Sequence, residues 1–351
     1  MSWRGPVLDE EQRALASMLD ALAATRERPT DEDQGAVAGL VAELAELGVW
    51  TLGTAEAAGG GGATRLTTAV AFERLGRTWP ALGWAAVQAH AAVDVLAGDD
   101  RFTDLVGLLH GGSAAVAVVD AASAHVRLSW QGDRLVGAVD RVDAAHVSPH
   151  LLLLTGDDSG LLVPAESTTV APVRRTGLDG ALTRAVSVDA PGAAVRTLEG
   201  VDAAAARARL RLGAAAVAAG IAGAAADEAL GYARSRRQFG GTLTEIPTVR
   251  QSLLAQAGRV TMILHAACAA TGDPVQPAAA ARAACDAAIE VTAAALQSHG
   301  GYGYLTEYPA ERHLRDAVSL RAATDAHTTG VAAARALAGI VSSPALRKDA
   351  P

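Results

Sequence analysis

The sequence predicts a mainly helical α+β protein, with helices at both ends and a small β domain between them. Aromatic residues make up only 3% of the chain and alanine is abundant, so small side chains must fill the core, which favours closely packed helices. Short β-prone segments separated by Gly, Asp, Pro and Ser gather between residues 113 and 198. We therefore expect an N-terminal helical domain over 1–112, a middle antiparallel β domain over 113–198 and a C-terminal four-helix bundle over 199–341.

The N-terminal zone shows helical spacing of its apolar residues. A first helix is expected to begin at Asp9, because acidic residues in the first turn favour the positive helix end. Further helices are expected over 37–47, 67–76 and 83–96, with the glycine run 59–62 as a loop.

The middle zone alternates strands and turns, and Gln131-Gly132-Asp133 is typical of a hairpin turn. Strands are expected over 116–119, 126–130, 134–137, 151–154, 160–163, 169–171 and 185–188.

Helices return over 201–236, 247–270, 277–299 and 309–340. Pro247, Pro277 and Pro309 suit first turns, where a missing N–H costs nothing. Residues 342–351 are expected to form a flexible tail.

Composition excludes several classes of function. The chain has 351 residues, is 19% charged and carries a net charge of −8 without a basic patch, so a nucleic-acid partner is not expected. No membrane span, signal peptide or metal site is predicted, and we expect a cytoplasmic protein. Cys268 and Cys285 lie in alanine-rich helical runs and are interpreted as buried free thiols.

Two motifs in the C-terminal zone carry chemistry. Arg236-Arg-Gln-Phe-Gly240 ends a long helix, and Gln297-Ser-His-Gly-Gly-Tyr-Gly-Tyr304 ends another, followed by Glu307, Arg312 and Arg315-Asp316. Each has a purely structural alternative: a basic last turn with a glycine cap, or a helix ending in a glycine loop. An arginine fork suits a diphosphate and an aromatic ring suits an adenine face.

In their order and spacing, these motifs resemble the C-terminal domain of the acyl-CoA dehydrogenases, and the helix–β–helix layout extends the resemblance over nearly the whole chain. The resemblance implies that Arg236, Gln238 and Phe239 contact the pyrophosphate and adenosine of an FAD bound mainly to a neighbouring subunit. It implies the same cofactor for Gln297, Gly300 and Gly301. His299 is interpreted as a core-edge residue.

The residues that would perform the family's chemistry are missing. The position that matches the usual catalytic glutamate, which removes the α-proton of an acyl thioester, is Thr324. The alternative position found in some members is Leu210, followed by Arg211. Asp325 is one residue away and is the reserve candidate for the base, with a helix-cap role as its alternative.

The β zone also departs from the family. The segment 121–125 is too short for the Thr-Glu-Pro and Gly-Ser-Asp segments that hold the flavin ring, and Arg141 falls near the position of the family's Trp-Ile-Thr.

The leading hypothesis is therefore a non-catalytic subunit of a heteromeric FAD-dependent acyl-CoA dehydrogenase, with two copies of each chain. The family's steroid side-chain enzymes are of this kind, and the resemblance implies an acyl-CoA substrate and an electron-transfer flavoprotein as acceptor. Two alternatives stay open: a complete flavoenzyme with Asp325 as base, and a flavin-free scaffold or acyl-binding protein.

Overall fold

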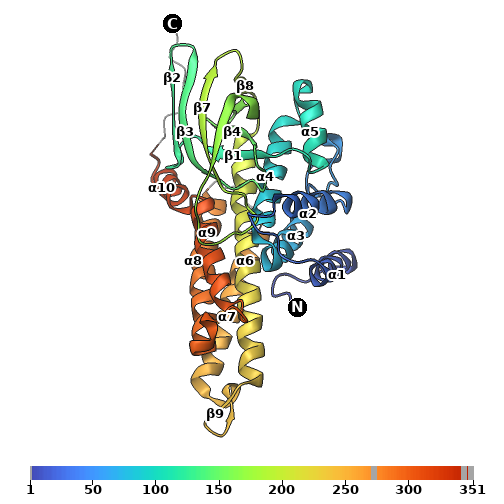
Figure 1. Ribbon diagram of the computed structural model, residues 1–351, viewed down its shortest axis with the longest axis vertical. Coiled ribbons are helices and arrows are strands. Elements are labelled where there is room, and N and C mark those ends of the chain that lie inside the picture. The colour runs from blue at the N-terminus through green and yellow to red at the C-terminus, as the bar shows by residue number, and fades with distance from the viewer. Residues whose placement is uncertain (1, 270–274, 341–345, 347–351) are drawn as a thin grey trace.

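Two small β-sheets cover one end of a long helical bundle, and the N-terminal helices pack against the side of that bundle (Figure 1). The computed structural model describes residues 2–269, 275–340 and 346. The predicted order of helices, β domain and helices is confirmed. The N-terminal helices are α1 (Glu10–Thr25), α2 (Gln34–Glu46), α3 (Arg65–Thr78), α4 (Pro80–Leu96) and α5 (Thr103–His110), with short 3-10 turns at Glu56–Ala58 and Asp100–Phe102.

Side-chain caps fix the starts of these helices. The carboxylate of Asp9 accepts a hydrogen bond from the Gln12 N–H at 2.8 Å, and the Gln12 side chain accepts one from the Asp9 N–H, which forms a capping box. Thr64 caps α3 in a similar way through the Thr67 N–H. The helix expected from Asp9 is thus confirmed.

The β domain consists of two four-stranded sheets, ordered β1-β4-β5-β8 and β2-β3-β7-β6. All pairs are antiparallel except β1 with β4, which run parallel, so the predicted antiparallel domain has one exception. The hairpin at Gly132 is confirmed, since Gln131 pairs with Arg134. The strands are β1 (Val116–Asp120), β2 (Val126–Gln131), β3 (Arg134–Val142), β4 (His150–Leu154), β5 (Ser159–Val163), β6 (Thr168–Pro172), β7 (Arg184–Pro191) and β8 (Arg196–Glu199).

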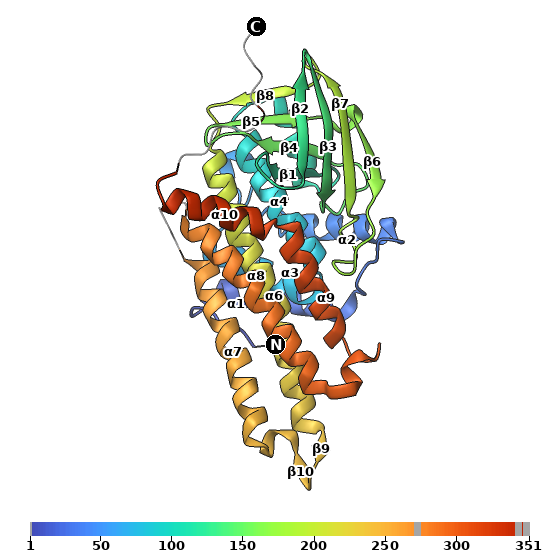
Figure 2. The same ribbon diagram turned by 90° about the vertical axis from the view of Figure 1, so that its left-hand side faces the viewer.

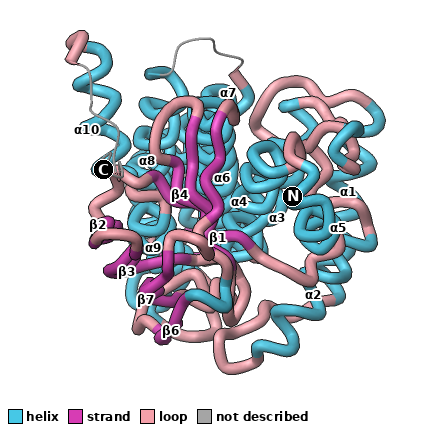
Figure 3. The backbone as a smooth tube through the Cα atoms, turned by 90° about the horizontal axis from the view of Figure 1, so that it is seen from above, coloured by secondary structure: helices cyan, strands magenta, loops and turns pink. Residues whose placement is uncertain are grey.

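The C-terminal bundle is built around α6, which packs against α7, α8 and α9, and the strands lie over its upper end (Figure 3). One prediction here is wrong: the helix expected over 309–340 is two helices, because Asp325 adopts a left-handed backbone with φ +45°. The elements are α6 (Ala203–Ser235), β9 (Arg237–Gln238), β10 (Gly241–Thr242), α7 (Pro247–Cys268), α8 (Val275–His299), α9 (Ala310–Ala323) and α10 (Ala326–Leu337).

Helix α6 is also the one helix in the described part of the chain that is long and apolar enough to cross a membrane. The sequence alone did not predict such a run. In the structure 78% of its most apolar stretch is buried inside the protein, as in the core helix of a globular fold.

Glycines let α3 and α6 approach closely. A Cβ atom added at Gly220 of α6 would lie 2.2 Å from the Glu73 carbonyl oxygen, and one added at Gly76 of α3 would lie 2.4 Å from the Val217 carbonyl oxygen. Both obstacles are backbone atoms, so the clash can be relieved only by moving the helices apart.

We therefore expect Gly220→Ala to destabilise the protein by roughly 1–3 kcal/mol through overpacking, offset by up to about 1 kcal/mol of helix propensity. Gly231→Ala is the matched control, because Gly231 is exposed on the same helix with no atom near its Cβ position. That variant should be as stable as the wild type or more so in urea unfolding. Equal stabilities for the two variants would contradict the close-packing argument.

Candidate functional site

A cavity lies where the β domain meets the bundle. We call it the inner cavity. Its walls come from α4, β1 and the β1–β2 loop, the end of β3, α6, α8, and the end of α9 with the turn into α10 and α10 itself, and its volume is about 90 Å³. One water needs roughly 10–15 Å³ of such space, so the cavity holds several waters. Its lining includes Trp84, Gln88, Ser123, Leu210, Arg211 and Ala323.

Part of the cavity wall is a buried ion pair. Arg141 donates to Asp143 at 2.6 Å, and the Asp143 side chain is only 1% exposed. The hydroxyl of Thr183 also donates to Asp143, at 2.5 Å, and Arg141 reaches the Ser319 carbonyl oxygen at 3.2 Å. These bonds fix a charged group where the resemblance places an aromatic residue beside the flavin ring.

Thr324 and Asp325 both line the cavity, at the turn between α9 and α10. The Thr324 hydroxyl donates to the Arg321 carbonyl oxygen at 3.3 Å and lies 3.8 Å from the Cys285 sulfur. Burial raises the pKa of the Cys285 thiol to about 11, so the thiol is neutral at pH 7. Neither of these two contacts of the Thr324 hydroxyl is a base that could activate it.

The carboxylate of Asp325 is fully engaged in structural bonds. One oxygen accepts from the Thr328 N–H at 3.4 Å, which caps α10. The other accepts from the Ser123 hydroxyl at 2.6 Å and the Ala124 N–H at 3.1 Å. These contacts match the helix-cap role, and a proton-abstracting role would have to break them.

The second candidate region lies at the far end of the bundle. Arg236 ends α6, and its guanidinium stacks on the Tyr302 ring, 5.0 Å from the ring centre. Phe239 is 92% exposed at φ +53°, at the tip of the β9–β10 hairpin. Among the described residues, the side chains of Arg236 and Gln238 have no hydrogen-bond or ion-pair partner. An exposed ring on a left-handed backbone is suited to contact with something outside this chain.

The end of α8 meets this hairpin region. Gln297 is exposed, Gly300 has φ +58°, and nothing lies within 4 Å of a Cβ built on Gly300 or Gly301. The open backbone at both glycines allows close approach of a ligand. His299, in contrast, is 3% exposed and packs 4.5 Å from the Tyr232 ring, with Nδ1 2.8 Å from the Ala295 carbonyl oxygen. These contacts match a packing role.

The structure thus brings the two predicted cofactor motifs into contact through Arg236 and Tyr302, but far from the inner cavity. Arg211 lines the cavity and Arg236 ends the same helix 25 residues later, which corresponds to roughly 38 Å along α6. In Figures 1 and 2 the β9–β10 hairpin lies at the opposite end of the bundle from the strands.

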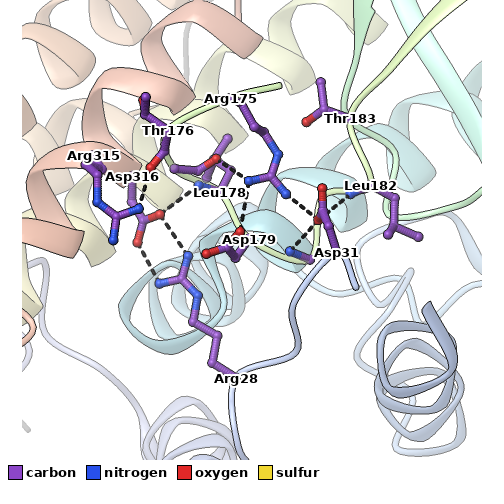
Figure 4. Close-up of polar contacts among 12 residues, drawn as sticks. Arg28, Asp31, Arg175, Thr176, Leu178, Asp179, Leu182, Thr183, Arg315 and Asp316 are labelled. Atoms are coloured by element: carbon purple, nitrogen blue, oxygen red, sulfur yellow. Dashed lines mark hydrogen bonds and ion pairs between the residues drawn. The ribbon is translucent and has the colours of Figure 1, made fainter. Parts of the chain in front are cut away.

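The Arg315-Asp316 pair serves the fold (Figure 4). Asp316 is 1% exposed and accepts two bonds from Arg28, at 2.6 and 2.8 Å, and one from the Leu178 N–H at 2.7 Å. Arg315 pairs with Glu311 and donates to the Thr176 carbonyl oxygen. Asp316 therefore ties the N-terminal helices and the β6–β7 loop to α9.

Two family models match the sequence. The model of the acyl-CoA dehydrogenase N-terminal domain matches residues 9–98, and that of the C-terminal domain matches residues 200–324. The chain belongs to the acyl-CoA dehydrogenase family. The residues between the two matches hold α5 and the β domain, and the β domain is where the sequence resembles the family least.

One relative matches part of the sequence, and two solved structures share the fold. The short-chain specific acyl-CoA dehydrogenase of Megasphaera elsdenii is 41% identical over 114 residues, which is 30% of each chain. The match thus spans under a third of that relative. A glutaryl-CoA dehydrogenase structure from Mycobacterium smegmatis has a TM-score of 0.80 at 20% identity and covers 96% of each chain. The Tcur3481–Tcur3483 steroid acyl-CoA dehydrogenase variant has a TM-score of 0.75 at 23% identity, with 94% of this chain and 99% of that chain covered.

The two regions differ in how well they fit a flavin. The inner cavity does not fit a flavin ring together with an acyl group, because it holds only several waters and the Arg141–Asp143 pair is locked into its wall. The bundle end fits the anionic part of FAD, since Arg236 has no carboxylate partner among the described residues and the Phe239 ring is free. Ser123 and Thr183, which bind Asp325 and Asp143, come from distant segments and could not be predicted from local sequence pattern.

Proposed function

We propose that this chain is a subunit of a FAD-dependent acyl-CoA dehydrogenase, and that it lends FAD-binding residues to a catalytic partner chain. The assembly would hold two copies of each chain. The observation that carries this proposal is the separation of about 38 Å between the inner cavity and the cofactor motif, combined with a cavity that does not fit a flavin ring.

Arg236, Gln238 and Phe239 would contact the pyrophosphate and adenosine of FAD held mainly by the partner, and Gln297, Gly300 and Gly301 would line the same cofactor. Their free donors, exposed ring and open backbone support this role. The guanidinium fork of Arg236 matches a diphosphate in charge and geometry.

FAD would supply the hydride acceptor for α,β-desaturation of an acyl-CoA thioester. The carboxylate that removes the α-proton would come from the partner, because Thr324 is neutral and Asp325 is engaged as a cap. The name of the similar Tcur3481–Tcur3483 steroid enzyme joins two components, which supports a heteromeric assembly and makes a steroid side-chain thioester a candidate substrate. An electron-transfer flavoprotein as acceptor, a role in lipid metabolism and a cytoplasmic location complete the proposal.

The test is co-expression with a dehydrogenase-like chain that carries a glutamate at the position matching Thr324. The combined variant Arg236→Ala, Phe239→Ala should leave the complex assembled on size exclusion but lower its FAD content at least ~10-fold, because charge-assisted bonds to the diphosphate are worth about 1.5–3 kcal/mol. Arg234→Gln is the control, since Arg234 is an exposed arginine in the same turn.

Other outcomes favour the alternatives. If the chain purifies alone as a yellow, active homo-oligomer and Asp325→Ala abolishes turnover, it is a complete enzyme. If neither the chain nor its complexes contain flavin, it is a scaffold or acyl-binding protein.

A further inference from the structure

Most of the charged side chains that line the inner cavity are paired with a group of opposite charge or with hydrogen-bond partners. Asp143 is held by Arg141, and Asp120 accepts from Arg207 at 2.6 Å. Arg207 also donates to the Leu154 and Gly156 carbonyl oxygens at 3.0 and 2.7 Å. Asp325 caps α10. Each of these charged groups of the lining therefore has its partners within the chain.

Arg211 is the exception. It lies on α6 one turn after Arg207 and lines the same cavity. Its guanidinium makes no hydrogen bond and no ion pair with any residue in 2–269, 275–340 or 346. Burial lowers the pKa of Arg211 although Asp120 opposes this, so the cation is poorly compensated where it stands. A partly buried guanidinium without an anion is costly, and an anion brought by a ligand would relieve that cost.

The other lining residues and the volume of the inner cavity indicate which kind of ligand would fit. Around Arg211 the lining is largely apolar, with Trp84, Val118, Leu210 and Ala214 among its members. The volume of about 90 Å³ has room for roughly six to nine non-hydrogen atoms by the same measure, which is the size of a short acid. A short apolar body with one planar anionic end matches both features, because a guanidinium fork binds a carboxylate through two parallel bonds.

We propose that the inner cavity is a binding site for a short carboxylate, held through its anionic end by Arg211. The carboxylate can be a free short-chain acid or the distal end of a short acyl-CoA thioester. This site belongs to the chain itself and is separate from the FAD half-site at the far end of the bundle.

The test is isothermal titration of the chain, in complex with its catalytic partner where the two purify together, with butyrate, succinyl-CoA and butyryl-CoA. Succinyl and butyryl groups have the same number of carbons and differ in the terminal carboxylate. We expect succinyl-CoA to bind about 10–100-fold more tightly than butyryl-CoA if the thioester is the ligand. If the free acid is the ligand, butyrate binds and its affinity matches or exceeds that of succinyl-CoA.

Substitutions of Arg211 test whether this side chain causes the preference for carboxylate ligands. Arg211→Gln should remove the 10–100-fold advantage of the carboxylate ligands and leave butyryl-CoA unaffected, while Arg211→Lys should keep part of it, since the charge remains and the fork is lost. Arg234→Gln on the same helix should bind like the wild type. Circular dichroism of each variant checks that it is folded.

The proposal is overturned if butyrate does not bind and succinyl-CoA binds no more tightly than butyryl-CoA, or if the carboxylate ligands bind Arg211→Gln as tightly as they bind the wild type. Flavin content reports on Arg236 and Phe239 and involves no residue of the cavity. The two proposals can therefore fail independently.

Discussion

Asp316→Ala should destabilise the protein by about 3–5 kcal/mol, which we expect to be the largest effect of a single substitution considered. The Asp316 side chain is 1% exposed and that of Arg28 is 14% exposed, so removing the carboxylate leaves a largely buried guanidinium without its anion. The Leu178 N–H loses its acceptor as well. Because these groups belong to three segments of the chain, the loss should loosen how the N-terminal helices and the β6–β7 loop meet α9 (Figure 4).

Urea unfolding followed by circular dichroism measures this effect. The neighbouring Arg315→Ala is the matched control, because the Arg315–Glu311 pair is 39% and 31% exposed and should contribute no more than about 1 kcal/mol. Asp316→Asn keeps the shape of the side chain but not its charge and should fall between the two. A cost for Asp316→Ala as small as that for Arg315→Ala would show that the buried pair does not stabilise the fold.

Sequence alone predicted features that depend on local pattern. The helix from Asp9, the hairpin at Gly132 and the three long helices α6, α7 and α8 follow from caps, turn residues and apolar spacing. The two cofactor motifs were predicted to act together, and the stacking of Arg236 on Tyr302 places them side by side.

Features that depend on distant contacts could not be predicted in this way. Asp325 interrupts the expected helix because its carboxylate binds Ser123, which is 202 residues away in the sequence. Asp316 pairs with Arg28, which lies 288 residues away in the sequence. The Arg141–Asp143 pair is an exception with a local signal, because an arginine and an aspartate only two residues apart at the end of a strand can pair.

Acid should destabilise the protein through His90. This side chain is fully buried on α4, where Nδ1 lies 2.7 Å from the Ala86 carbonyl oxygen and Nε2 lies 3.0 Å from the Gly53 nitrogen. A carbonyl can only accept and a backbone N–H can only donate, so the ring must be neutral with its proton on Nδ1. Protonating Nε2 would place its N–H against the Gly53 N–H, so that two donors would face each other. Burial lowers the pKa of His90 to about 3.

The lowered pKa of His90 determines how the free energy of unfolding changes with pH. Because the pKa is lower in the folded protein than the usual 6.5, His90 contributes its full stabilisation above about pH 6.5 and loses it as the pH falls toward 3. The loss amounts to about 1.4 kcal/mol per pH unit, or about 3 kcal/mol between pH 6.5 and 4.5. His313, whose pKa burial lowers to about 4, acts in the same range and direction.

A comparison of pH profiles isolates the contribution of His90. His90→Gln cannot titrate, so its free energy of unfolding, although lower at pH 7, should fall less steeply than that of the wild type between pH 6.5 and 4.5. His265→Gln, which replaces an exposed histidine on α7, should keep the wild-type slope. Parallel profiles for His90→Gln and the wild type would mean that the bonds to Ala86 and Gly53 do not hold the ring neutral. The acid sensitivity would then have to arise from the carboxylates and from His313, His146 and His150, whose pKa values burial also lowers.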